Sequence, residues 1–302
     1  MTYKSMLWSG VWVAALPAYA VDPQAGQNVV AIEPHLQPLM SALVEEKAIV
    51  YLSRDDVPEA MITRQARIGI SSQRWTDQQI ARFELSKGYR PTELFFTADV
   101  VALLVNEDNP VKAISIEEVQ RVFGCHAQPD YVHWSQWKSE PAPYMAAFGI
   151  DGEFDMHREF NQWITCKANT YAATQLLADD ESLKAKLAAT PEAISYVTYS
   201  DRWRDYPKLS IIDKRGDTYD LNKETILSGR YPLASVYYLY LDLSPNHPQV
   251  TEAEKVVRDL ALTNEHQATL NQYGFISLPE EAIHRNQVAL GLATPIIEGG
   301  YK

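Results

Sequence analysis

The sequence has only two cysteines, a deficit of positive charge, and no long apolar run after its first residues. The formal net charge of −12 disfavours nucleic acids and anionic membrane surfaces as partners, because their phosphates would repel the chain at long range. No internal repeat or low-complexity tract interrupts the 302 residues, of which 46% are hydrophobic and 22% are charged. Such a composition is typical of an ordinary globular protein.

Residues 1–20 have the three regions of a secretory signal peptide. A lysine is followed by the apolar stretch Met6–Ala15, and the small-residue sequence Ala18-Tyr19-Ala20 predicts cleavage after Ala20. A membrane anchor is the alternative, but the apolar stretch is well short of the roughly 20 residues that span a bilayer. No lipid-attachment cysteine follows, so we expect a free, soluble periplasmic protein that does not insert directly into the membrane.

Cys125 and Cys166 both lie in the predicted mature chain, in a compartment that favours disulfides. We therefore expect a disulfide between them, worth up to roughly 4 kcal/mol in the chain-entropy model. The alternative is a metal site that adds His126 and His133, but its spacings match no zinc pattern. We expect no metal and no other cofactor.

Helical and strand patterns alternate through most of the chain, which predicts an α/β protein with largely buried sheets. The Val- and Leu-rich run Asp99–Asn106 has no polar alternation, as expected of a central strand that is buried on both faces. The aromatic run Tyr231–Leu241 is also β-prone, and the chain can form two lobes if both strands cross between them. Capping sequences predict helix starts at Ser53–Asp56, Thr76, Ser115–Glu118 and Thr251–Glu254.

Several blocks of the sequence resemble segments of one known family, in the same order along the chain. Residues Ala98–Pro110, the helix up to Gly124, and Trp134–Trp137 resemble the crossing strand, helix and tryptophan turn of phosphate-type periplasmic binding proteins. Ile194–Val197 resembles the family's glycine-tyrosine strand, with Ser195 in place of the glycine. The segments that resemble the return crossing and the closing part are Tyr231–Tyr240 and Leu262–Leu278.

The resemblance implies a type II periplasmic binding fold of two α/β lobes joined by two crossing strands. Residues 21–104 and 231–302 would form lobe I, and residues 105–230 would form lobe II. The family implies a solute-binding protein rather than an enzyme, with phosphate or another oxyanion as the first candidate ligand. Its partner would be a membrane transporter of the ABC type or a sensor. Helix amino ends, hydroxyls and an arginine would hold the anion, and closure of the hinge would bury it.

The match to the family's anion-binding residues is incomplete. Ile32-Glu33-Pro34-His35 stands where the family has its first glycine-serine-threonine turn, and the second-lobe segment Phe148–His157 has three carboxylates and no hydroxyl. Acidic residues favour helix amino ends, which accounts for these carboxylates; a site for a cationic, metal-bridged or larger ligand is the alternative. The candidate ligand residues are Ser53, Arg54, Ser71 and Ser72 on one lobe, and Gly149, Asp151, His157 and Arg158 on the other.

A partner-docking or sensory module and a hydrolase are the two alternatives to solute binding. A cleft that has lost its ligand would leave the fold as a partner-docking or sensory module. A hydrolase would need a nucleophile with a neighbouring base, and no such pair can be assigned from the sequence. The chain also has no phosphate-binding glycine loop of the nucleotide-binding type and no metalloprotease helix motif.

Overall fold

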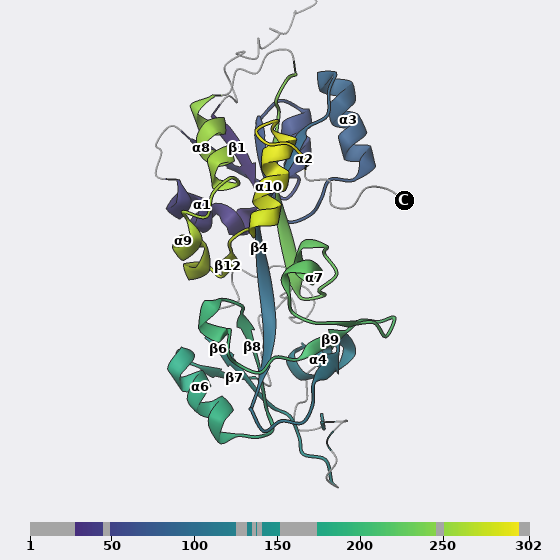
Figure 1. The fold of residues 1–302 in the computed structure, drawn as a ribbon, viewed down its shortest axis with the longest axis vertical. Coiled ribbons are helices and arrows are strands. Elements are labelled where there is room, and N and C mark those ends of the chain that lie inside the picture. The colour runs from purple at the N-terminus through teal and green to yellow at the C-terminus, as the bar shows by residue number, and fades with distance from the viewer. Residues whose placement is uncertain are drawn as a thin grey trace, which may run out of the picture.

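The computed structural model describes residues 28–44, 49–124, 132–134, 137, 141–151, 174–245 and 251–295. The predicted signal peptide lies outside these residues, and so do both cysteines, His157 and Arg158. The expected disulfide therefore stays a prediction. Figure 1 shows an elongated molecule, in which the helices and the other strands gather around the two ends of one long strand, β4 (Thr92–Val105).

The described part of the chain alternates strands and helices as the sequence pattern predicts. The other strands are β1 (Val29–Ile32), β2 (Val50–Ser53), β3 (Ile68–Ser71), β5 (Ala113–Ser115), β6 (Ala146–Ile150), β7 (Gln175–Leu177), β8 (Ala193–Thr198), β9 (Ser210–Ile212), β10 (Thr218–Tyr219), β11 (Ala234–Leu241) and β12 (Phe275–Ile276). The helices are α1 (Gln37–Leu43), α2 (Val57–Ile62), α3 (Asp77–Lys87), α4 (Ile116–Phe123), α6 (Asp180–Ala189), α7 (Lys223–Leu227), α8 (Glu252–Leu260), α9 (Gln267–Gln272) and α10 (Glu280–Ala289). Two short 3-10 helices are η1 (Pro34–Leu36) and η3 (Asp201–Trp203).

The first lobe is built on three parallel strands, in which β1 pairs with β2 on one edge and with β3 on the other. Helices α1 and α2 make the crossover connections that parallel strands require. β11 pairs antiparallel with both β3 and β4, so it lies between them in the sheet. The sheet is buried on both faces, with one core cluster around Leu39 and Phe96 and another around Met61 and Trp75.

The second lobe continues the same sheet beyond β4. β8 pairs antiparallel with β4, β6 pairs parallel with β8, and β7 pairs parallel with β6. A small sheet of β10, β9 and β5 lies beside them. Helix α6 packs on β6 and β8, where Leu183, Leu187 and Trp203 are fully or almost fully buried.

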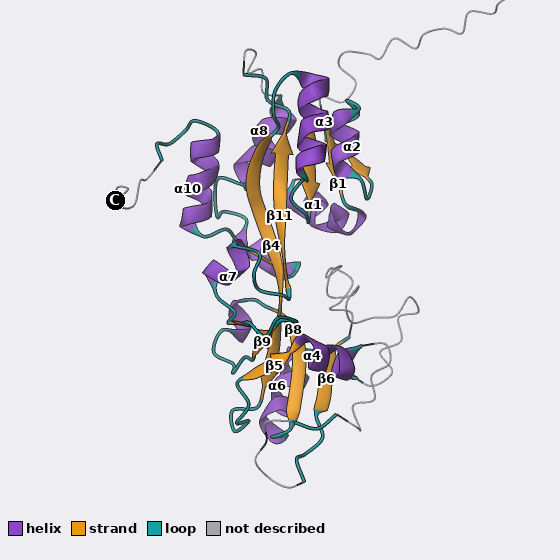
Figure 2. Cartoon of the chain, turned by 90° about the vertical axis from the view of Figure 1, so that its right-hand side faces the viewer, coloured by secondary structure: helices purple, strands orange, loops and turns teal. Residues whose placement is uncertain are grey.

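Strand β4 belongs to both lobes. Its residues Thr92–Val100 pair with β11, and its residues Val101–Val105 pair with β8. Because β11 runs beside β4 in the opposite direction, two adjacent strands form the central ribbon of the molecule (Figure 2). The expected two-lobed α/β fold with two crossing strands is therefore confirmed.

Both crossing strands have different limits from those predicted. β4 begins at Thr92 rather than at Asp99, because Thr92–Ala98 include polar residues and owe their extended form to pairing with β11. β11 begins at Ala234 rather than at Tyr231. The residues before it form a turn, in which the backbone N–H of Ala234 donates to the carbonyl of Tyr231 at 3.2 Å.

Three of the four predicted helix starts are confirmed. Thr76, Ser115 and Thr251 are the N-caps of α3, α4 and α8, and each forms a capping box with the residue three positions later. The start predicted at Ser53–Asp56 is wrong in its detail, because Ser53 still pairs with β1 as the last residue of β2. Asp56 is the N-cap of α2, and its carboxylate accepts from the backbone N–H of Glu59 at 3.1 Å.

Candidate functional site

The directions of the strands bring the carboxyl-terminal ends of two sets of strands, one in each lobe, toward each other. β3 is antiparallel to β11, and β11 is antiparallel to β4, so β1, β2 and β3 run in the same direction as β4, toward the second lobe. β8 is antiparallel to β4, so β8, β6 and β7 run toward the first lobe. In open α/β sheets, ligands bind outside the carboxyl ends of the strands. The candidate site therefore lies where these two sets of strand ends face one another.

The first-lobe half of the site contains a cavity of about 240 Å³ at the ends of β1 and β3. Ser71 lines this cavity, and its hydroxyl donates to the carbonyl of Gln73 at 2.9 Å. Arg54 does not line it, because its guanidinium donates to the side chain of Gln65 at 2.8 Å. Ser53 is exposed at the end of β2. The cavity is lined by Glu33, Asp55, Asp56, Pro58, Ser71, Gln73, Arg74, Trp75, Thr76 and Gln79.

Glu33 is the residue of this half that sequence analysis missed as a site residue. It directly follows β1 and is only 4% exposed. Its Oε1 accepts two hydrogen bonds from Ser72, one from the backbone N–H at 2.9 Å and one from the hydroxyl at 3.0 Å. An acidic residue directly after a buried parallel strand was the available signal, because such positions lie at the ligand-binding edge of the sheet.

A chain of buried side chains continues from Glu33 to the crossing strands. His35 Nδ1 lies 3.7 Å from Glu33 Oε2, and His35 Nε2 lies 2.9 Å from the hydroxyl of Tyr237. That hydroxyl donates to Asp99 Oδ2 at 3.3 Å, and Asp99 Oδ1 accepts from the backbone N–H of Ser235 at 3.1 Å. The site is therefore connected through side chains to both β11 and β4.

Trp75, which lines the first-lobe cavity, belongs to an aromatic pair. Trp75 stacks on Tyr240 with ring centroids 4.3 Å apart, and the Tyr240 hydroxyl accepts from the Trp75 backbone N–H at 2.8 Å. Burial raises the pKa of Tyr240, and the nearby charge of Glu93 raises this pKa further. The phenol therefore stays protonated and donates to Glu93 at 2.9 Å.

The second-lobe half contains Gly149 and Asp151 at the end of β6. Gly149 lies within the strand, one residue before its end, and it is buried. A Cβ at this position would collide with the hydroxyl and ring of Tyr196, so no larger side chain fits here without rearrangement. Asp151 is exposed, and its backbone N–H donates to the carbonyl of Leu177 at 2.9 Å. The predicted partners His157 and Arg158 lie outside the described residues.

A larger cavity of about 620 Å³ lies on the other edge of β4. β11 occupies one edge of β4 near Ala98, so β12, which also pairs with Ala98 and Asp99, must lie on the opposite edge. Figure 2 likewise shows α7 and α10 on the β4 side of the central ribbon, and β1, α2 and α3 on the β11 side. None of the six candidate ligand residues that the structure describes lines this cavity. Its lining includes Thr97, Ser200, Arg204, Lys223, Asn271 and Glu280.

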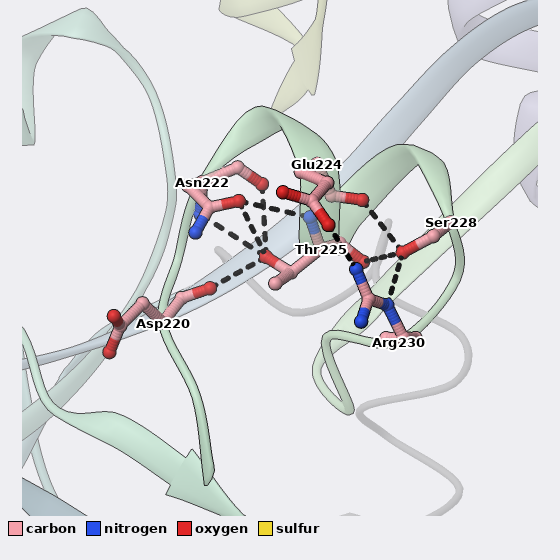
Figure 3. A network of polar contacts seen from close by, with 6 residues as sticks. All are labelled: Asp220, Asn222, Glu224, Thr225, Ser228 and Arg230. Atoms are coloured by element: carbon pink, nitrogen blue, oxygen red, sulfur yellow. Dashed lines mark hydrogen bonds and ion pairs between the residues drawn. The ribbon is translucent and has the colours of Figure 1, made fainter.

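The short helix α7, which lines the larger cavity, is held by a local polar network (Figure 3). Asn222 caps the helix by accepting from the Thr225 backbone N–H at 3.0 Å, and the Thr225 hydroxyl donates to the carbonyl of Asp220 at 2.6 Å. Arg230 pairs with Glu224 at 2.5 Å and donates to the Ser228 hydroxyl at 2.9 Å. The network fixes the turn that leads into β11.

The described residues offer no metal site and no membrane span. Within the described ranges, no group of three or more His, Cys, Asp or Glu side chains could hold a metal ion. Among the same residues, no helix has both the length and the apolar composition that crossing a membrane requires.

Two adjacent crossing strands, with the carboxyl ends of two parallel strand sets facing each other, define the class of two-lobed binding proteins. Residues 19–262 match the family model described as the PBP superfamily domain, and the chain therefore belongs to the PBP superfamily. The sequence resemblance to phosphate-type periplasmic binding proteins is thereby confirmed at the level of the family.

Relatives and solved structures agree with this placement. The phosphate-binding protein PstS of Pseudomonas aeruginosa is 23% identical over 299 residues, which cover 92% of this chain and 91% of PstS. Protein SphX of Synechococcus elongatus is 27% identical over 163 residues, covering 51% of this chain and 48% of SphX. Among solved structures, a possible phosphate binding protein from Planctomyces limnophilus superposes with a TM-score of 0.63 at 17% identity, covering 87% of this chain and 96% of that one. PstS from Borrelia burgdorferi superposes with a TM-score of 0.53 at 15% identity, and the superposition covers 83% of this chain and 99% of that PstS chain. At these identities the structures show a shared fold.

Proposed function

We propose that this protein is the exported solute-binding component of an uptake system. It holds a small polar solute between its two lobes and passes the solute to a membrane transporter of the ABC type. The observation that carries the proposal is the pair of opposed strand ends, with Ser71 and Ser72 on one lobe and Gly149 and Asp151 on the other. Polar backbone and side-chain groups at such ends bind ligands in other open α/β sheets.

The relative PstS supports an uptake role, because its matched region covers almost its whole length and its name describes phosphate binding. The signal peptide predicted at residues 1–20 supports a periplasmic location. Under this proposal, residues 21–104 and 231–302 form lobe I and residues 105–230 form lobe II.

Thermal unfolding with a solute panel tests the proposal. The panel includes phosphate, sulfate, amino acids, polyamines and sugars. A solute present at a hundred times its dissociation constant should raise the free energy of unfolding by about 2.7 kcal/mol, which gives a clear shift in melting temperature. Titration calorimetry then gives the affinity and stoichiometry of each solute that causes a shift.

Two tryptophan variants show whether binding occurs at the proposed place. Gln73→Trp puts a large side chain at an exposed position that lines the first-lobe cavity, and should abolish the solute-induced shift. Gln78→Trp is the matched control, because Gln78 is exposed on α3 and does not line the cavity. A wild-type protein that responds to no solute would refute the uptake role and favour the partner-docking or sensory module instead.

A further inference from the structure

The cavity of about 620 Å³ on the far edge of β4 is lined by two sets of residues. One set lies on β12, on the first turn of α10 and between these two elements. The other set lies on α7 and in the segment that follows β8. Figure 2 shows α10 and α7 on the same side of the central ribbon, one beyond the other along β4. The volume lies within the range of roughly 300–1,000 Å³ that is typical of small-molecule sites.

Both sets of lining residues are anchored to β4. On α10, the side chain of Asn286 bonds to the backbone N–H and to the carbonyl of Phe95, each at 2.8 Å. Next to α7, the hydroxyl of the buried Tyr231 donates to the carbonyl of Val101 at 3.2 Å. The backbone N–H of Tyr231 donates to the carbonyl of Thr225 on α7 at 2.9 Å. Because one strand holds both sets, the cavity is formed before any ligand enters, which lowers the entropic cost of binding.

The charged lining residues are separated by sign. Glu280 and Glu281 lie in the first turn of α10, whereas Lys223 is the first residue of α7 and Arg204 directly follows η3. Lys223, Glu280 and Glu281 form no ion pair within the part of the chain that the structure describes. A ligand with a negative group at one end and a positive group at the other complements this arrangement.

A buried hydroxyl also belongs to the lining. Ser200 is 7% exposed, and its Oγ has no hydrogen-bond partner among the described residues. Buried hydroxyls are normally hydrogen-bonded, so this one calls for an acceptor from outside the protein. Ser200 lies four residues before Arg204, in the basic set of the lining, where the negative group of a ligand would supply that acceptor. The apolar part of the lining consists of Leu221, Ile226, Leu227, Ile276, Leu278 and Pro279.

We propose that this cavity is a second ligand site, separate from the cleft, which binds a short zwitterionic peptide. The carboxylate of the peptide pairs with Lys223 and Arg204 and accepts from Ser200. Its ammonium group pairs with Glu280 and Glu281, and its apolar side chains cover the apolar lining. The inference goes beyond the proposed function, because the described candidate ligand residues of the cleft do not line this cavity.

Titration calorimetry with the dipeptide leucyl-leucine and its capped forms tests the inference. Acetylating the amino group or amidating the carboxylate should each weaken binding about threefold to fivefold, as expected of exposed charge pairs. Lys223→Gln should reduce the penalty of amidation, and the double variant Glu280→Gln/Glu281→Gln should reduce that of acetylation. Lys214→Gln removes an exposed lysine outside the cavity and should change neither penalty. Ser200→Ala should weaken binding without lowering the melting temperature.

Two tryptophan variants locate the bound peptide. Asn264→Trp puts a large side chain at an exposed position that lines the cavity, and should abolish binding. Glu265→Trp is the matched control, because Glu265 is exposed and does not line the cavity. Gln73→Trp, in the first-lobe cavity, should also leave peptide binding unchanged. Circular dichroism shows whether each variant is folded, and the charge variants remain informative if Asn264→Trp does not fold.

The outcomes separate this inference from the proposed function. Peptide binding that survives in folded Asn264→Trp would overturn the second site. Binding that Gln73→Trp abolishes would also overturn it, but would support the cleft as a solute site. Equal affinity for the free and the capped dipeptides would refute the pairing of charges, and a wild type that binds none of them would overturn the inference altogether. The proposed function is decided independently, by the solute panel.

Discussion

Asp242 lies in an enclosed charged cluster of the first lobe, outside the candidate site. It directly follows β11 and is 5% exposed. Its two carboxylate oxygens accept from Lys87 Nζ at 2.6 Å and from the Tyr89 hydroxyl at 2.5 Å. Burial, followed by the hydrogen bond to Asp242, raises the pKa of Tyr89, so that its phenol remains a donor.

We expect Asp242→Asn to lower the free energy of unfolding by about 3–5 kcal/mol, because it leaves the ammonium of Lys87 buried without a counter-charge. Chemical denaturation monitored by fluorescence measures the loss. Combining Asp242→Asn with Lys87→Met should recover part of it, because no unpaired charge then remains. As a control, Glu181→Gln breaks the exposed Lys184–Glu181 pair and should have little effect. A similar small effect for Asp242→Asn would contradict this account.

The residues of the candidate site were only partly predictable from sequence. The sequence places Ser71 and Ser72 at the end of a short apolar strand, which is a local signal, and the structure has Ser71 as the last residue of β3 and Ser72 directly after it. The roles of Glu33 and Tyr196 depend on contacts with residues 39 and 47 positions away along the chain, at Ser72 and Gly149. No local pattern carries such contacts, because the fold determines which strand ends become neighbours.

Helix α8 combines a capping box with buried charge. Glu254 accepts from the backbone N–H of its N-cap Thr251 at 2.7 Å and lies 2.9 Å from Arg67 Nε. Its residue surface is fully buried, and this burial raises the pKa of Glu254 above its ordinary value of 4.5 despite the cap and the arginine. The native state therefore binds the proton of Glu254 more tightly than the unfolded chain does.

This shift gives a pH prediction for α8. A raised native pKa contributes stability that is present below pH 4.5 and is lost as the pH rises through the native pKa. Glu254→Gln cannot titrate, so the stability of the variant relative to wild type should improve as the pH rises from about 4 to 7. An amide can serve at this position, since Gln79 completes the same capping box in α3. As a control, Gln79→Ala removes the corresponding side chain from the capping box of α3, and its effect on stability should not depend on pH in this way. If the stability of Glu254→Gln relative to wild type instead worsens with rising pH, the prediction is wrong.

At the scale of elements, the sequence predicts where a helix starts better than it predicts how far a strand extends. The caps at Thr76, Ser115 and Thr251 involve residues only three positions apart, so the sequence pattern is enough. The length of β4, in contrast, does not depend on residues close together in the sequence. Thr92–Ala98 are extended because β11, more than a hundred residues later in the chain, pairs with them.

The whole molecule should unfold in one step although it has two lobes. β4 pairs with strands of both lobes, and one core cluster contains Ala98 and Val236 from the crossing strands together with Val119 and Tyr196 from the second lobe. Loss of either lobe would therefore expose apolar surface of the other. Differential scanning calorimetry should give a single transition with calorimetric and van't Hoff enthalpies that agree. Two separated transitions would show that the lobes are energetically independent.

The place of β11 in the sheet also decides when the chain can acquire its native form. β11 separates β3 from β4, although it follows β4 by more than a hundred residues. The first lobe cannot complete its sheet until Leu241 is available, so nearly the entire polypeptide must emerge from a ribosome or a translocation pore first. Contacts of such long sequence separation slow folding. A late-arriving central strand thus delays the native form of the first lobe until most of the chain is available. Under the proposed export, this delay suits a chain that must be threaded through a narrow channel before it folds.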